Sequence, residues 1–152
     1  MSLDVAGIVA AVESHAEATG VFERVVTTEP KAAPGKGMSV AIWAQDVGPV
    51  NAASGLAAVS VRVTLMVRVL KPMLSQPYGQ IDPDILTAVD TLMSAYAGDF
   101  NLGGTVRNVD LLGQHGTAMA GRAGYLTIDK QTFRIMDITL PLIINDLWNE
   151  VP

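Results

Sequence analysis

Residues 57–70, AAVSVRVTLMVRVL, decide the fold of this chain. Apolar side chains occupy every second position from Val59 to Val69, and Ser60, Arg62 and Arg68 are among the residues between them. Alternation with a period of two is typical of a strand that buries one face. The face predicted to be buried consists of Val59, Val61, Val63, Leu65, Val67 and Val69.

The length of this strand is itself informative. Fourteen residues at roughly 3.3 Å each span about 45 Å. A compact domain of this size has a radius of gyration of only about 15 Å. We therefore expect the strand to cross the whole domain, to bend sharply, or to project beyond it.

Two segments have the 3.6-residue spacing of amphipathic helices. The first runs from Ser2, as its cap, to about Thr19, with Gly20 as a stop. The second starts at Asp82-Pro83, with the cap first and proline at the first helical position, and ends at Gly98. The apolar positions are Val5, Ile8, Val9 and Val12 in the first helix, and Ile85, Ala88, Val89, Leu92, Met93 and Tyr96 in the second. The second set is predicted to pack on the buried strand face.

Alternation and β-branched residues predict further strands on both sides of the second helix. Asp129–Thr132 reads as a hairpin connection, Pro141 as the end or edge of the last strand, and Ile143–Trp148 as a short closing turn. The predicted strands are Val21–Thr28, Met38–Val47, Thr105–Leu112, Tyr125–Ile128 and Phe133–Leu140. The order is helix, three strands, helix, three strands, which predicts a single α+β domain over residues 1–152, mainly an antiparallel sheet with two helices packed on one face.

The intervening segments are predicted to be loops because they contain proline, glycine and small residues. Glu29–Gly37 and Gly113–Gly124 lack the apolar residues needed to offset the ordering of their backbone, about 1–2 kcal/mol per residue. We expect these two loops to be flexible in the isolated subunit and to become ordered on assembly, unless they are plain surface loops. The other predicted loops are Lys71–Ile81 and Asp99–Gly104.

The composition is poor in charge. Charged residues make up 16% of the chain, against roughly 25% in typical domains. Either the domain is simply rich in small residues, or neighbouring subunits cover much of its surface, since permanent interfaces lose charge at their centres. The net charge of −5 and the absence of any basic run argue against a grip on nucleic acid.

The chain offers no recognisable chemistry of catalysis. It has no cysteine, and its two histidines, His15 and His115, lack partners at metal-ligand spacing. The nucleophile elbow and the phosphate-binding glycine patterns are absent. Asp82 and Asp84 are better explained by a helix start than by paired catalytic carboxylates. We expect no enzyme activity, no cofactor and no metal ion. We also expect neither a membrane span nor a signal peptide, because no apolar run is long enough and no basic residue precedes the first one.

Some residues are candidates for contact with another subunit or with the tail. Arg62 and Arg68 lie on the polar face of the long strand, where they face either water or an acidic neighbour. Trp43, on the polar face of its strand, is either covered by a helix or an interface anchor. The full candidate set is Pro30, Lys31, Pro34, Lys36, Trp43, Arg62, Arg68, His115 and Arg122.

Several stretches, taken in order, resemble the tail-terminator proteins of long-tailed bacteriophages, especially those of actinobacterial phages. They are GVFERV at 20–25, EPKAAPG at 29–35, AIW at 41–43, SGL at 54–56, Arg62–Arg68, SAYAGDF at 94–100, VDLLG at 109–113 and ITLPLIINDLW at 138–148. The resemblance covers nearly the whole chain. It rests on the series of motifs, because no single one is catalytic.

This resemblance implies a structural virion protein at the head–tail junction, made in the host cytoplasm. Its subunits would form a hexameric ring that caps the completed tail tube, contacts the major tail tube protein and joins the head-side connector or stopper. DNA would pass through the lumen without specific binding, which suits a net negative charge. The alternatives are a head–tail connector or stopper subunit, a tail tube-like protein, or a non-viral module that binds a small molecule.

Overall fold

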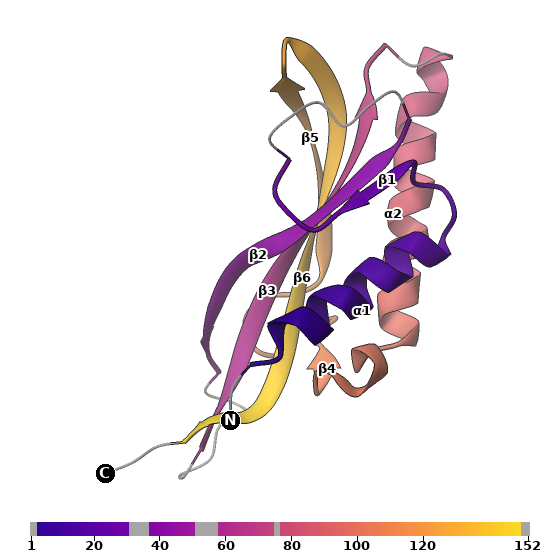
Figure 1. Ribbon diagram of the computed structural model, residues 1–152. Coiled ribbons are helices and arrows are strands. Elements are labelled where there is room, and N and C mark those ends of the chain that lie inside the picture. Colours follow the sequence, from indigo (N-terminus) through magenta and orange to yellow (C-terminus); the bar gives the residue numbers. More distant parts are fainter. Residues whose placement is uncertain (1–2, 31–36, 51–57, 75–76, 150–152) are drawn as a thin grey trace.

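A computed structural model describes residues 3–30, 37–50, 58–74 and 77–149. Over these residues, the molecule is elongated and comprises two α-helices, two short 3₁₀ helices and six strands (Figure 1). In chain order they are α1 (Val5–Ala18), β1 (Arg24–Val26), β2 (Ser39–Pro49), β3 (Ala58–Pro72), η2 (Tyr78–Gln80), α2 (Ile81–Gly98), η3 (Leu102–Gly104), β4 (Asn108–Val109), β5 (Ala120–Ile128) and β6 (Gln131–Asn149). The predicted order of a helix, three strands, a helix and three strands is confirmed.

The strands form one sheet in the order β1-β2-β3-β6-β4. β5 also pairs with β6, beside its first half, while β4 pairs with Leu142 and Ile143 further along the same edge. Every pairing is antiparallel except that between β1 and β2. Both helices cover one face of the sheet (Figure 1), which confirms the predicted α+β class. We call the other side the open face.

β3 buries the face that its alternation predicts, although Ser60, Thr64 and Leu70 on its other face are buried as well. Its odd-numbered residues from Val61 to Val69 are buried, while Val59 is only half-buried. They form one apolar core with Ile85, Val89 and Leu92 of α2. Figure 1 shows β3 running the length of the molecule, so the strand crosses the whole domain.

The prediction that Pro141 ends or edges the last strand is wrong, because β6 continues to Asn149 with β3 along one side. The Pro141 carbonyl accepts a 2.9 Å hydrogen bond from the Asp110 amide, on the side away from β3. In an antiparallel sheet, the backbone N–H and C=O of one residue face the same neighbouring strand. The missing N–H therefore falls on that side, in the gap between the last β5 partner, Thr139, and the first β4 partner, Leu142. The β3–β6 ladder loses nothing.

The predicted loop Gly113–Gly124 is also partly wrong, because Ala120–Gly124 belong to β5. The hairpin connection is shorter than predicted: Gln131 and Thr132 are in β6, and only Asp129 and Lys130 form the turn. Their φ angles of 51° and 65° are those of a two-residue turn whose twist matches the flanking strands. Glycine-rich composition suggested a loop, but pairing with β6 makes this segment a strand.

Other boundaries also differ from the predictions. The strands predicted at 21–28 and 105–112 shrink to three and two residues, and 143–148 continues β6 instead of forming a closing turn. β3 extends to Pro72, into the predicted loop that precedes α2. β6 carries an irregularity where Val61 pairs with Ile144 and Val59 with Trp148, so three β6 residues lie opposite one β3 residue.

The helix caps also differ. Asp4, not Ser2, caps α1, because its Oδ1 accepts a hydrogen bond from the Gly7 amide; Ser2 lies outside the described residues. α2 starts at Ile81 with Gln80 as the cap, which makes no side-chain cap bond. Asp82 therefore lies within the first turn, where it complements the helix dipole. Among the residues described, no helix has both the length and the apolarity to cross a membrane.

Candidate assembly surfaces

The structure brings Trp43 and Arg68 together on the open face. The Arg68 guanidinium lies 5.1 Å from the centre of the Trp43 ring and donates two hydrogen bonds to Asp137, of 2.7 and 2.9 Å. These hydrogen bonds raise the pKa of Arg68. Arg68 thus already has an acidic partner within its own chain, and Trp43 is covered in part by a cation rather than by a helix. Arg122 of β5 lies opposite Asp137 in the sheet and is exposed.

A second cluster joins Arg62 to the segment after β4. The Arg62 Nη1 donates a 2.9 Å hydrogen bond to the His115 carbonyl. Asp110, only 2% exposed, accepts hydrogen bonds from the amides of Gln114 and His115, of 2.8 and 2.9 Å. The Met119 amide donates to the Asp110 carbonyl, which closes the segment. Hydrogen bonds thus hold residues 114, 115 and 119 to Arg62 of β3 and to Asp110, just after β4, within one subunit. The ordering of this segment on assembly stays a prediction.

The remaining candidates do not join these clusters. Pro30 is half-buried beyond β1. Lys31, Pro34 and Lys36 lie outside the described residues, as does most of the predicted loop Glu29–Gly37. An interface role for any of the nine residues stays a prediction.

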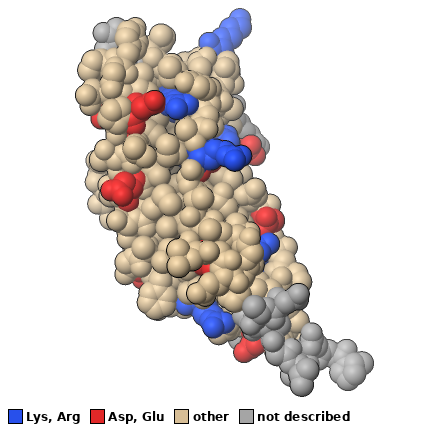
Figure 2. All heavy atoms as spheres, turned by 180° about the vertical axis from the view of Figure 1, so that it is seen from behind, with Lys and Arg blue, Asp and Glu red and all other residues tan. Residues whose placement is uncertain are grey.

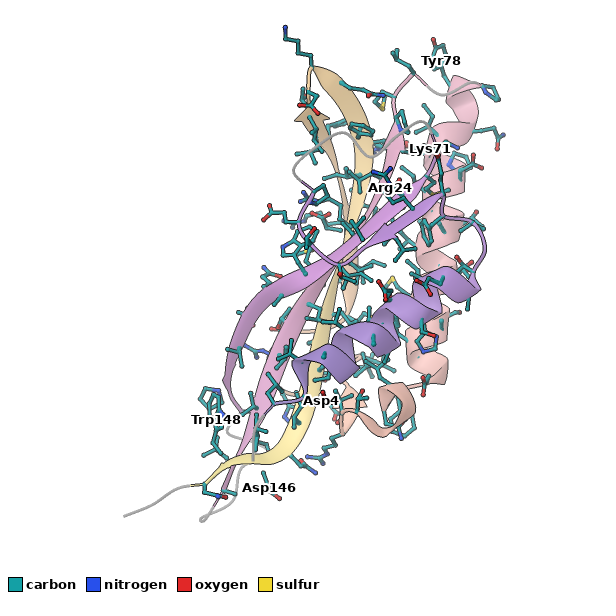
Figure 3. The ribbon with its side chains drawn as sticks, in the orientation of Figure 1. Asp4, Arg24, Lys71, Tyr78, Asp146 and Trp148 are labelled. Atoms are coloured by element: carbon teal, nitrogen blue, oxygen red, sulfur yellow. The ribbon has the colours of Figure 1, made fainter. Side chains whose placement is uncertain are left out.

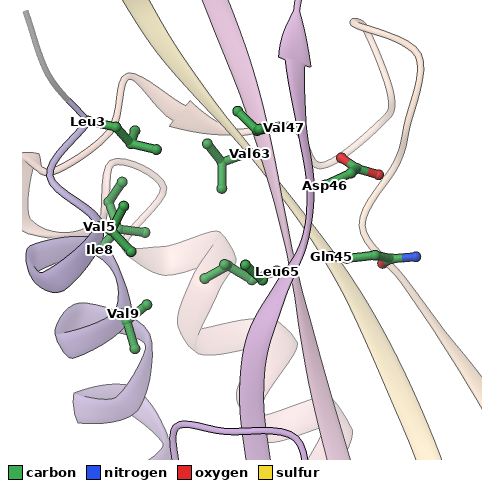
Figure 4. Close-up of a pocket in the computed structure, with 10 residues that line it drawn as sticks. Leu3, Val5, Ile8, Val9, Gln45, Asp46, Val47, Val63 and Leu65 are labelled. Atoms are coloured by element: carbon green, nitrogen blue, oxygen red, sulfur yellow. The ribbon is translucent and has the colours of Figure 1, made fainter.

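An apolar cavity of about 360 Å³ lies between the start of α1 and the distal half of β2. β1 pairs only with Ser39–Ala41, so beyond Ala41 β2 has β3 as its only strand neighbour among the described residues. Val5 and Val47, on the rim, are 53% and 55% exposed. Figure 4 shows Gln45 and Asp46 pointing away from the cavity, to the other side of β2. The full lining is Leu3, Val5, Ile8, Val9, Ala44, Gln45, Asp46, Val47, Val63 and Leu65.

A second apolar surface lies at the β4 edge of the sheet. Leu112, in the turn after β4, is 85% exposed, and Phe100 is 54% exposed. Both line one shallow groove with Asn108, Val109, Asp110, Leu111 and Gln114. The sequence offered a weak signal for this surface: the adjacent leucines 111 and 112 cannot both face inward on a strand. The sequence offered no such signal for Val5 and Val47 on the cavity rim, because each belongs to a helix or strand whose other apolar residues are mostly buried or half-buried.

His15 joins α1 to the end of α2. Its Nε2 lies 2.8 Å from Oδ2 of Asp99, and Asp99 Oδ1 accepts a hydrogen bond from the Gly103 amide. These two hydrogen bonds, that of His15 foremost, lower the pKa of Asp99. The His15 ring meets Tyr96 edge-on at 5.8 Å, and burial raises the pKa of Tyr96 well above its usual range. The pair is a structural clasp between two helices. Within the described part of the chain, no three His, Cys, Asp or Glu side chains are placed to share a metal ion.

No protein-family model matches the chain, and no curated protein matches it. Among solved structures, it is similar to a chain of the virion of a native gene transfer agent particle, with 16% identity and a TM-score of 0.45. That similarity covers 93% of this chain and 98% of the other.

The chain is also similar to a sheath/tube terminator of an extracellular contractile injection system in its extended state, with 10% identity and a TM-score of 0.46. The similarity covers 96% of this chain but 59% of that one, so the present chain spans little more than half of its length. At these values, neither similarity assigns a function to the chain.

Proposed function

We propose that this chain is a structural subunit of a long-tailed bacteriophage virion, and that it forms a ring that caps the completed tail tube. The ring, a hexamer by the sequence resemblance, contacts the major tail tube protein on one side and the head-side connector or stopper on the other. DNA passes through its lumen without specific binding. The subunit acts at the head–tail junction and catalyses no reaction.

The observation that carries this proposal is the pair of exposed apolar surfaces on opposite edges of one charge-poor sheet. Clustered exposed apolar side chains mark interaction sites. The chain exposes Val5 and Val47 beside the cavity at the β2 edge, and Phe100 and Leu112 in the groove at the β4 edge. Figure 2, seen from behind, shows charged residues thinly scattered over a mostly uncharged surface. These are the features of a subunit that repeats side by side.

The sequence resemblance supports the choice of assembly. Its motifs run in order through nearly the whole chain. The structure confirms the order of helices and strands that was predicted from the same sequence. The two clusters of polar residues fit a structural role: Arg68 pairs with Asp137, and Arg62 and Asp110 bond to backbone groups of the segment after β4.

A module that binds a small molecule is the alternative that the cavity raises, since its volume falls within the range of ligand sites, roughly 300–1,000 Å³. Ligand sites also carry a few polar groups that orient the ligand. Here the two polar lining residues, Gln45 and Asp46, point away from the cavity (Figure 4). The arrangement suits an apolar side chain better than a metabolite.

Phage particles assembled without this chain test the proposal. We expect tubes that exceed the normal tail length and heads that stay unjoined, and purified chain added to such lysates should restore joining. Normal tails joined to heads would contradict the proposal. Short tails, or none, would move the chain to an earlier step such as tube building.

A further inference from the structure

We infer that the apolar surface at the β4 edge of one subunit inserts into the cavity at the β2 edge of a second copy of this chain, with Leu112 as the inserted side chain. The inference rests on the proposed ring, and it names the residues that join neighbouring subunits. Three independent observations support it.

The first observation is register. Val47 of β2 pairs with Val63 of β3, Val63 pairs with Leu142 of β6, and Leu142 pairs with Val109 of β4. These four residues form one row across the sheet, perpendicular to the strands. Val47 lines the cavity at one end of the row, and Val109 lines the groove with Leu112 at the other. The two surfaces therefore stand at the same height on opposite edges.

That geometry determines what repetition produces. A contact between two different patches is heterologous, and it generates a closed ring or an open helical filament. Joining the two ends of a single row needs no shift along the strand direction. Repetition without that shift lacks the rise of a helical filament, so this contact is compatible with the closed ring of the proposed function.

The second observation is complementary shape. Leu112 protrudes from a turn and is 85% exposed, and Phe100 beside it is 54% exposed. The cavity is concave and lined by aliphatic side chains of α1, β2 and β3. A few side chains that fill well-packed, desolvated pockets carry most of the binding energy of an interface.

The third observation is charge. One exposed carboxylate flanks the cavity, that of Asp4, which caps α1 beside the lining residues Leu3 and Val5. On the other edge, the exposed Arg107 directly precedes Asn108 of the groove and donates a hydrogen bond to Asn145. An acidic residue on one edge thus meets a basic residue on the other, which favours this pairing of edges over the contact of two like edges. Figure 3 shows Asp4 at the same end of the molecule as Asp146 and Trp148 of β6, and Lys71 and Tyr78 at the opposite end.

Disulfide trapping tests the inference, because the chain has no cysteine of its own. Purified Val47→Cys and Leu112→Cys single variants are mixed at high concentration and oxidised, and a Val47→Cys/Leu112→Cys double variant is oxidised alone. The mixture should give one covalent dimer, and the double variant a ladder that ends at the ring. The control is a Val47→Cys/Leu86→Cys double variant, since Leu86 is 59% exposed on α2 and lies outside both surfaces. A ladder from this control equal to that of the Val47→Cys/Leu112→Cys variant would overturn the inference. The absence of a cross-link between Val47→Cys and Leu112→Cys would also overturn it.

A second measurement follows association without cross-linking. Leu112→Asp should weaken self-association at least tenfold by mass photometry or sedimentation, while Leu86→Asp should leave it unchanged. Rings that form normally with Leu112→Asp would overturn this interface and leave the proposed tail function standing. Cross-linking as expected, combined with normal tails in phage that lack the chain, would instead retain the interface and reject the function.

Discussion

At the level of single residues, the contact between the Asp99 carboxylate and His15 links the end of α2 to α1. The pKa of Asp99 is lowered, chiefly by His15, so the ionised form belongs to the folded state. A carboxyl whose folded pKa lies below its unfolded value, about 3.9, adds stability that is present above that pH and is lost as the pH falls through the folded pKa. We expect an NMR titration to find the Asp99 pKa below its ordinary value in the wild type and closer to it in His15→Gln. Equal pKa values in the two proteins would show that the His15 contact does not form.

Removal of the Tyr96 hydroxyl is expected to stabilise the protein. The residue is fully buried, and its hydroxyl has no hydrogen-bond partner among the described residues. A buried unsatisfied polar group costs about 1–3 kcal/mol. Tyr96→Phe should therefore unfold at equal or higher urea concentration, with a gain of about 1 kcal/mol. The control is Tyr125→Phe, at a site 64% exposed, which should change nothing. A loss of stability in Tyr96→Phe would reveal a hydrogen bond to that hydroxyl.

Asp110 is the residue on which the segment after β4 depends. Asp110→Asn keeps the size of the side chain but leaves one oxygen where two accept hydrogen bonds from Gln114 and His115. We expect a loss of about 1–3 kcal/mol in the free energy of unfolding, and faster hydrogen exchange at those two amides. Asp90→Asn, on the exposed side of α2, is the matched control. Unchanged exchange at both amides would contradict the anchoring role of Asp110.

At the scale of elements, β3 carries the fold. Leu65 is 1% exposed and faces the core shared with α2. Leu65→Asp should abolish soluble expression, because an unpaired buried carboxylate costs several kcal/mol. Leu86→Asp, the same change on the exposed side of α2, should express normally. A Leu65→Asp variant with ordinary thermal stability would mean that the buried face of β3 is inverted.

The elements also show how far the sequence leads. Alternation identified β3 and its buried face, and helical spacing identified α1 and α2, because those patterns record burial directly. β5 was partly missed because Ala120, Gly121 and Gly124 have no strand propensity, and their pairing with β6 is a long-range effect. The sequence prediction ended β6 at Pro141. Proline is tolerated there because its missing N–H faces the gap between the β5 and β4 pairings, and the sequence alone does not show that gap.

At the scale of the whole molecule, two of the polar candidates chosen from sequence, Arg62 and Arg68, turned out to have partners within the chain. Arg62 and Arg68 are held by His115 and Asp137, which are 53 and 69 residues away in sequence. The exposed apolar residues at the two edges could not be identified in this way. A leucine in the sequence looks the same whether it lies in a core or in a turn. Only the register of four strands places Val47 and Val109, which lines the groove with Leu112, at the same height on opposite edges.

We propose a single ring of this chain between the tail tube and the head, and electron cryo-microscopy of the intact virion, with the subunit fitted into the density, tests this role. We expect one ring of this fold at the head-proximal end of the tube, with Leu112 of each subunit facing Val47 of the next. Density for this fold repeated along the tube, located elsewhere in the particle, or absent from it would contradict the proposed role.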